Sequence, residues 1–122
     1  GLTAFASRPT IEILANTAQA QVVRDSVSGI TGAIFYEAGS AGPFTVDQPC
    51  VLLLRETNQG TSLAISDPTQ KLTGVLHVRA NFAVGKLIKS DAAIKVDAAS
   101  PLQLTVNAAG SSGRTLTAAF RK

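Results

Sequence analysis

The sequence is poor in the residues that most often build binding sites and membrane segments. Its 122 residues include no tryptophan, no methionine, one cysteine, one histidine and one tyrosine. The longest uninterrupted apolar run, Cys50 to Leu54, is far shorter than the ~20 residues of a membrane-spanning helix, so we expect no membrane partner. Since the chain begins at Gly1 and contains no methionine, we expect it to be a piece of a longer protein.

Charge is scarce as well. Charged residues make up 16% of the chain, whereas they make up about 25% of an average soluble domain. This shortage predicts that one face of the domain is covered by another domain or by a second copy. The net charge of +3 is spread over separate segments without interleaved aromatic residues, so we expect no nucleic-acid partner.

The same shortages argue against a catalytic or metal site. Cys50 has no partner for a disulfide within the chain and lies in an apolar segment, so we expect a small buried thiol. His77 is the only histidine, and without a second histidine or another cysteine no metal site is predicted. The carboxylates are scattered singly, so no calcium loop or paired acid and base is predicted. We therefore expect no catalytic residue, no metal and no cofactor.

The feature that organises the chain is a β-hairpin at its centre. The apolar run Cys50 to Glu56 predicts one strand, and the alternation from Thr61 to Ser66 predicts its partner. Between them lies a polar turn that ends at Gly60, where we expect a positive φ. The run Asp67 to Gln70 is a further turn, because Pro68 fixes φ at its second position. The predicted core-facing residues of the hairpin are Leu52, Leu54, Leu63 and Ile65.

Short strands with turn residues between them continue on both sides of this hairpin. In the predicted strand Thr10 to Asn16, residues Ile11, Ile13 and Ala15 share one face. Both faces of Ile30 to Glu37 are apolar, which predicts a central strand covered on each side, and Gly29 before it should take a positive φ. Further strands are predicted at Ala20 to Asp25, Phe44 to Val46, Lys71 to Asn81, Ile94 to Ala98, Leu102 to Val106 and Leu116 to Phe120. The pattern predicts an all-β fold, an antiparallel β-sandwich of about nine or ten short strands, with residues 1–9 as a lead-in or linker and residues 10–122 as one domain.

Several of these segments also resemble a known family when they are taken in order. They are the run Asn16 to Arg24 (NTAQAQVVR), the run Phe44 to Cys50 (FTVDQPC), a strand ending in Arg55 and Glu56, and the run Ser66 to Gln70 (SDPTQ). Together they resemble the C-terminal β-domain of the hyaluronate, chondroitin and xanthan lyase family, polysaccharide lyase family 8. The resemblance extends from about Glu12 to Val78.

The resemblance implies a non-catalytic accessory role in a secreted, extracellular polysaccharide lyase. That family cleaves uronic-acid-containing polysaccharides by β-elimination, and its catalytic Asn, His, Tyr and Arg belong to an N-terminal helical toroid. Nothing in this chain matches that toroid, so neither His77 nor Tyr36 is assigned a catalytic role. The implied partners are the remainder of the parent lyase, which is a preceding β-sandwich and a helical catalytic domain, and an anionic polysaccharide.

Two other classes of protein remain open, and one substrate contact is predicted. Lys86 and Lys89 are the best candidates to bind a polyanionic substrate, because they give one short segment two positive charges. A free-standing carbohydrate-binding module would fit a β-sandwich, although such modules usually present exposed aromatic rings, which are few here. A structural immunoglobulin-like module would fit the strand count.

Overall fold

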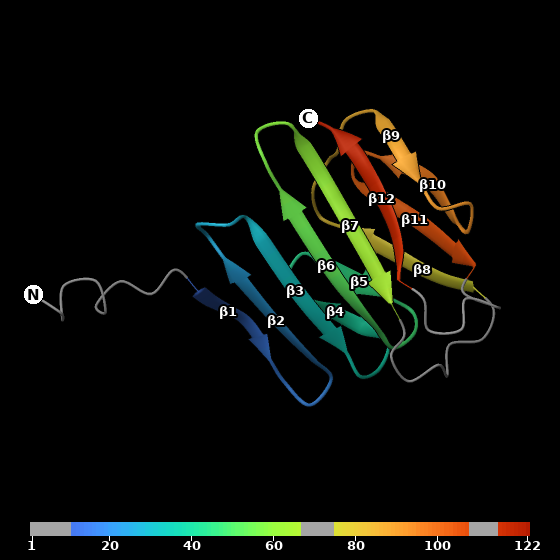
Figure 1. Cartoon of the computed structure of the whole chain (residues 1–122). Coiled ribbons are helices and arrows are strands. Elements are labelled where there is room, and N and C mark those ends of the chain that lie inside the picture. The colour runs from blue at the N-terminus through green and yellow to red at the C-terminus, as the bar shows by residue number, and fades with distance from the viewer. Residues whose placement is uncertain (1–10, 67–74, 108–114) are drawn as a thin grey trace, which may run out of the picture.

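The computed structural model describes residues 11–66, 75–107 and 115–122. Within these residues twelve strands form two antiparallel sheets, which confirms the predicted all-β sandwich. Figure 1 shows the two sheets facing each other, with β1 at one outer edge. Two strands were not predicted from the sequence, Gly39–Ala41 and Leu87–Ser90. Both are short, and they bring the count above the predicted nine or ten.

The larger sheet has seven strands and contains the predicted hairpin near its middle. Its strand order is β1-β2-β3-β6-β7-β12-β9. The hairpin strands β6 and β7 pair directly, and Leu54 lies opposite Leu63. The strands of this sheet are β1 (Ile11–Asn16), β2 (Ala20–Asp25), β3 (Ile30–Phe35), β6 (Cys50–Glu56), β7 (Gly60–Ser66), β12 (Leu116–Arg121) and β9 (Leu87–Ser90).

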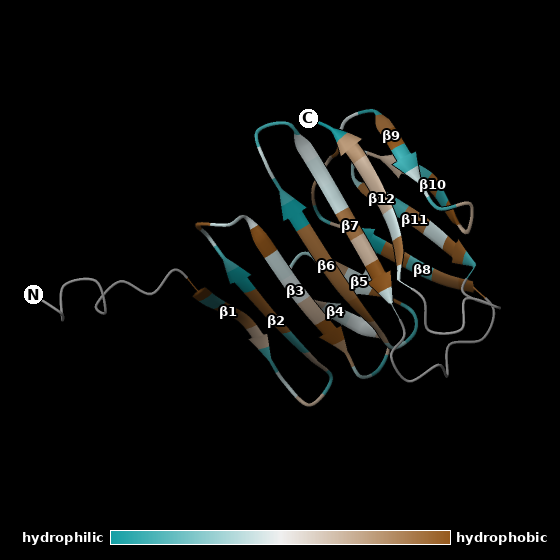
Figure 2. Cartoon of the chain, viewed as in Figure 1, coloured by the Kyte–Doolittle hydropathy of each residue, from teal (hydrophilic) through white to brown (hydrophobic). Residues whose placement is uncertain are grey.

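The smaller sheet has five strands in the order β10-β11-β8-β5-β4. Its longer strands alternate apolar and polar residues, which Figure 2 shows as brown and teal bands on β8, β10 and β11. This alternation is expected of a sheet with one buried and one solvated face. The strands of this sheet are β10 (Ile94–Ala99), β11 (Leu102–Asn107), β8 (Val75–Ala80), β5 (Phe44–Val46) and β4 (Gly39–Ala41).

The core lies between the two sheets and uses alternate residues of most strands. The four predicted hairpin residues are all buried, with exposed fractions of 2% or less. Cys50 is buried among them, as predicted. In the smaller sheet, Phe44 packs edge-to-face against Phe82 at a centroid distance of 6.4 Å. Both sheets therefore contribute to one continuous hydrophobic cluster.

Three local predictions need correction, and one is confirmed. A β-bulge between Ile13 and Ala15 turns Ala15 to the opposite face from Ile13, so Ala15 packs against the core. Gly60 does not have a positive φ; it is glycine because a Cβ there would lie 2.1 Å from the carbonyl oxygen of Phe120 on the neighbouring strand. Gly29 does have the predicted positive φ, +71°.

The third correction concerns β3. It is central in its sheet, between β2 and β6, as predicted. The structure covers only one of its faces, which carries Thr31, Ala33 and Phe35. Ile34 on the other face is 39% exposed. The predicted turn at Asp67 to Gln70, the start of the strand predicted from Lys71, and residues 1–9 lie outside the described residues.

Candidate functional site

Lys86 and Lys89 lie at the outer edge of the seven-stranded sheet, where both side chains are exposed. Lys89 belongs to the edge strand β9 and lies opposite Ala119 of β12. The backbone carbonyl of Lys86 accepts a hydrogen bond from the backbone N–H of Arg121, at 2.8 Å. Arg121 is followed by Lys122, so the two neighbouring segments of this edge carry four basic residues. We call Lys86, Lys89, Arg121 and Lys122 the basic edge.

The basic edge adjoins a surface hollow of about 530 Å³, whose lining includes Arg121 and Lys122 together with Glu56. A cluster of cations at one edge raises the local potential and attracts polyanions over several ångströms. Two members of the basic edge were not predicted. Arg121 and Lys122 are distant in sequence from Lys86, and only the pairing of β12 with β9 brings them together.

Tyr36 and His77 do not approach each other. Tyr36 directly follows β3 in the seven-stranded sheet, whereas His77 belongs to β8 in the five-stranded sheet. His77 and Arg79 share the outer face of β8, because the buried Val78 lies between them. This agrees with the face predicted for both residues.

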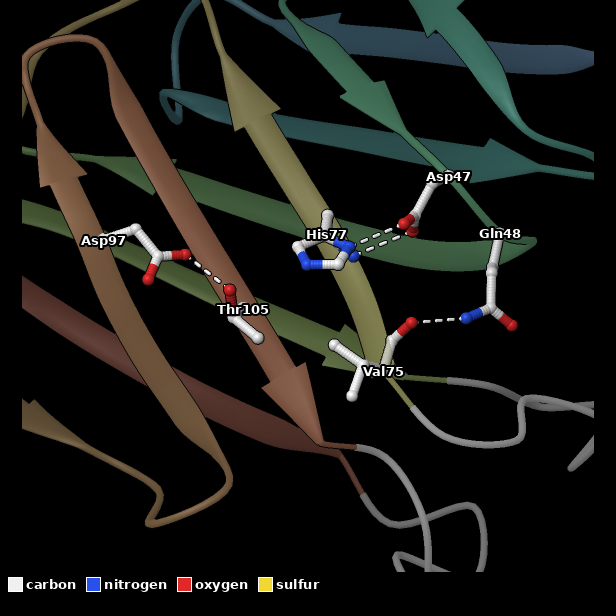
Figure 3. Close-up of polar contacts among 6 residues, drawn as sticks. All are labelled: Asp47, Gln48, Val75, His77, Asp97 and Thr105. Carbon is white, nitrogen blue, oxygen red and sulfur yellow. Dashed lines mark hydrogen bonds and ion pairs between the residues drawn. The ribbon is translucent and has the colours of Figure 1, made fainter.

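His77 nevertheless has a partner that the sequence did not reveal. Asp47 directly follows β5 and accepts two hydrogen bonds from His77, as Figure 3 shows. The backbone N–H of His77 lies 2.8 Å from Oδ1 of Asp47, and the ring Nδ1 lies 2.7 Å from Oδ2. Both side chains are about half exposed, at 61% and 47%. The two residues are 30 positions apart in sequence, which explains why no local pattern indicated the pair.

This contact lowers the pKa of Asp47. Partial burial raises the pKa of the carboxyl, but hydrogen bonds from the backbone N–H and ring of His77, with electrostatic attraction to that ring, outweigh burial. The net result is a pKa below the usual value of 3.8. The carboxylate therefore stays ionised at neutral pH, as an acceptor for His77.

The Asp47 contact continues an incomplete strand ladder. Backbone pairing between β5 and β8 ends at Val46 and Val78. Beyond that point Asp47 accepts from the N–H of His77, and the side-chain amide of Gln48 donates to the carbonyl of Val75 (Figure 3). Two side chains thus replace backbone partners along the exposed edge of β8, which explains the pair structurally.

The outer face of the five-stranded sheet carries an open groove of about 320 Å³, lined by polar side chains and by Val46, Val78 and Leu104. Beside the Asp47 and His77 pair, the hydroxyl of Thr105 donates to a carboxylate oxygen of Asp97 (Figure 3). Such side chains bind sugar hydroxyls or water equally well, because all offer simple donors and acceptors. The polar residues that line the groove are Thr45, Asp47, His77, Arg79, Asp97 and Gln103.

Neither a metal site nor a membrane span was predicted. Among the described residues, no group of three or more His, Cys, Asp or Glu side chains is placed to hold a metal ion. Within those same residues, no helix has the length and apolar character to cross a membrane.

Comparison with known proteins identifies the family. Residues 12–75 match the family model of the polysaccharide lyase family 8 C-terminal β-sandwich domain. Over 111 residues the chain is 34% identical to a hyaluronate lyase of Thermasporomyces composti, an alignment that covers 90% of this chain and 14% of that protein.

Solved structures agree with the sequence match. A Paenibacillus xanthan lyase superposes with a TM-score of 0.91 and 28% identity, over 98% of this chain and 12% of that one. A chondroitin AC lyase of Streptomyces coelicolor superposes with a TM-score of 0.89 and 27% identity, over 98% of this chain and 16% of that one. The chain thus spans less than a fifth of the length of each relative. It belongs to polysaccharide lyase family 8, as a C-terminal β-sandwich domain of that family.

Proposed function

We propose that this chain is a non-catalytic accessory domain of a secreted lyase that cleaves uronic-acid-containing polysaccharides by β-elimination. It supports the neighbouring domain of that lyase, and its basic edge helps to hold the polyanionic substrate. The observation that carries the proposal is the alignment of nearly the whole chain with a small, C-terminal share of lyases acting on such polymers.

The geometry supports a role without catalysis. β-Elimination needs a base that removes the proton next to a uronate carboxyl, and groups that stabilise the developing negative charge, all within reach of one sugar. Tyr36 and His77 lie on different sheets. The ring Nδ1 of His77 already contacts Asp47, in a pair whose backbone contact completes a strand edge. The two side chains are therefore not brought together as the base and acid of one site.

The basic edge supports a role in substrate binding. Lys89 and Arg121 lie on the paired strands β9 and β12, and Lys86 and Lys122 directly flank these strands. Asp91, the nearest acidic residue in sequence to Lys89, accepts a hydrogen bond from the backbone N–H of Thr117. A few exposed cations bind a polyanion weakly, and salt screens the interaction. This predicts contact with a long chain rather than tight recognition of one sugar.

One experiment tests both parts of the proposal. The purified chain is incubated with hyaluronate, chondroitin or xanthan, and unsaturated uronate ends and binding are both measured. We expect no product, and weak binding that falls steeply with added salt. The Lys86→Ala/Lys89→Ala variant should bind several-fold more weakly, whereas the control Lys95→Ala, on the other sheet, should bind like the wild type. Product that disappears in His77→Ala or Tyr36→Phe would make the chain an enzyme.

A free-standing carbohydrate-binding module is the alternative, and the groove on the five-stranded sheet, with its polar side chains, is the observation that favours it. Hydrogen bonding to neutral sugar hydroxyls depends little on salt, whereas binding through the basic edge depends on it strongly. Binding that persists at high salt, is lost in Arg79→Ala and is unaffected in the Lys86→Ala/Lys89→Ala variant would support this alternative.

A further inference from the structure

The two outer faces of the sandwich differ in character. The five-stranded sheet presents polar side chains such as Thr45, His77 and Arg79, as expected of a face in water. The seven-stranded sheet presents large apolar side chains along β1, β2, β3 and β6. Their exposed fractions are Ile11 59%, Ile13 70%, Val23 39%, Ile34 39% and Leu53 49%. We call these five residues the apolar face.

Strand register makes the apolar face continuous. One row across the sheet runs from Ile13 through Val23 and Gly32 to Leu53, each residue lying opposite the next. Ile34 lies two residues along β3 from Gly32, on the same face. Directly opposite side chains in adjacent strands are about 4.5–5.5 Å apart, so no polar side chain separates members of this row. A continuous exposed apolar patch marks a surface that another molecule or domain covers.

Gly32, in the middle of the row, is a second and independent observation. A glycine inside a strand weakens the strand, and it often marks a place where another backbone approaches closely. Nothing in the described part of the chain requires it: φ is not positive, and among those residues an added Cβ would approach only Cδ1 of Leu53, at 4.0 Å. The glycine leaves a dip in the apolar face between Val23 and Leu53, open to whatever covers that face.

We propose that the apolar face packs against the domain that precedes this one in the parent lyase, with part of that domain seated over Gly32. The inference rests on the proposed function, because it needs a parent protein. The relatives are six or more times longer than this chain, and the family description places this domain at their C-terminus. The preceding domain is therefore joined to the N-terminal side of this one.

The first strand of the described residues borders the apolar face. This strand, β1, is an edge strand of the seven-stranded sheet, and it carries Ile11 and Ile13 (Figure 1). Units consecutive in sequence are usually adjacent in space. A domain tethered by a short connection has an effective concentration on the order of millimolar, which a second copy in dilute solution does not reach. The tethered domain is therefore favoured over a second copy.

Hydroxyl-radical footprinting of side chains tests this placement directly. The 122-residue chain and the natural full-length protein that contains it are labelled under identical conditions. We expect the labelling rates of Ile34 and Leu53 to fall several-fold in the full-length protein. The rate for Val75, an exposed residue of the five-stranded sheet, serves as the internal control and should not change.

A substitution at Gly32 supplies the second arm. Gly32→Val adds a side chain with good strand propensity where this chain has room, so the isolated chain should unfold at an equal or higher denaturant concentration. In the full-length protein the valine side chain would fill the dip and keep the preceding domain from packing there. The labelling of Ile34 and Leu53 should therefore return to the rate of the isolated chain. Gln103→Val, on the opposite outer face, is the matched control and should leave that labelling low.

Two labelling results would overturn the placement, and a third result separates it from the proposed function. Equal labelling of Ile34 and Leu53 in both proteins would show that the face is not covered. Protection that appears in the isolated chain together with a dimer in sedimentation would make a second copy the occupant. If the full-length protein protects both residues but lacks lyase activity, the proposed function fails while the docking surface stands.

Discussion

At the scale of single residues, the most informative contact joins Asp47 to His77. A histidine and an acid in contact invite a catalytic interpretation, but both side chains are about half exposed. The carboxylate also accepts from the backbone N–H of residue 77, so it holds the strand as well as the ring. With Gln48 donating to the carbonyl of Val75, the pair extends the edge of β8 past the end of β5. We interpret Asp47 as a structural acceptor.

The pH dependence of stability follows from this contact. The pKa of Asp47 is lower in the folded chain than its usual value of 3.8, so the folded chain binds the proton less readily than the unfolded chain. The stabilisation is complete above pH 3.8 and is lost as the pH falls through the folded pKa. Because both side chains are exposed, the loss should be small, about 0–1 kcal/mol.

Removing the ring of His77 tests the cause of this shift. His77→Ala removes the Nδ1 contact but keeps the backbone N–H, so the pKa of Asp47, followed by NMR titration of its carboxyl carbon, should rise. The control Val75→Ala alters β8 without touching the carboxylate and should leave the titration unchanged. An identical titration curve in His77→Ala would show that the ring does not lower this pKa.

At the scale of elements, the central hairpin shows what alternation in a sequence determines. Leu54 is 1% exposed on the inner face of β6, while its neighbour Leu53 is 49% exposed on the outer face. Consecutive strand residues point to opposite faces, so two chemically identical neighbours have opposite environments. Deleting the side chain of each one therefore measures the register of β6.

Leu54→Ala should lower the free energy of unfolding by about 2–5 kcal/mol, because it leaves a cavity between the sheets. Leu53→Ala, the matched control, should change stability by no more than about 0.5 kcal/mol, as surface substitutions usually do. Both are measured by urea denaturation of the isolated chain. Equal costs, or a larger cost for Leu53→Ala, would mean that the register of β6 is shifted by one residue.

The sequence predicted which residues of each strand face the core better than it predicted which strands pair with one another. Alternation is local, so the buried positions of β6, β7, β11 and β12 followed from it directly. The bulge that turns Ala15 inward depends on how β1 pairs with β2, and the glycine at position 60 depends on the approach of Phe120 from another strand. For the same reason the Asp47 contact and the full basic edge were not predicted: each joins residues through strand pairing distant in sequence.

The resemblance to the lyase family was predicted correctly because it rests on local runs of residues, from Glu12 onward, that the family model also matches. The exposed face of β3 was predicted wrongly for a physical reason. Its sequence indicates burial on both sides, and the chain itself covers only one. A strand with apolar residues on both faces is expected in a domain that packs against a neighbouring domain. This agrees with the proposed docking surface.

At the scale of the whole molecule, both sheets depend on one core. The hydrophobic cluster includes Phe35, Leu52 and Phe120 from the seven-stranded sheet and Phe44 and Leu104 from the five-stranded sheet. Neither sheet buries its inner face without the other, so the domain should unfold in a single cooperative transition. From the sequence pattern, in which the first predicted strand begins at Thr10, we propose that residues 1–9 are dispensable for folding, as a lead-in or linker would be.

Two probes, one on each sheet, test this prediction. The chain has one tyrosine and no tryptophan, so tyrosine fluorescence reports on Tyr36 beside β3, while the ring protons of His77 report on β8 by NMR. Both signals should give the same urea midpoint, because loss of either inner face exposes the other. A chain that starts at Thr10 should unfold at that same midpoint, within experimental error. Separate midpoints for the two probes would divide the chain into independent units, and a lower midpoint for the shortened chain would place residues 1–9 within the folded domain.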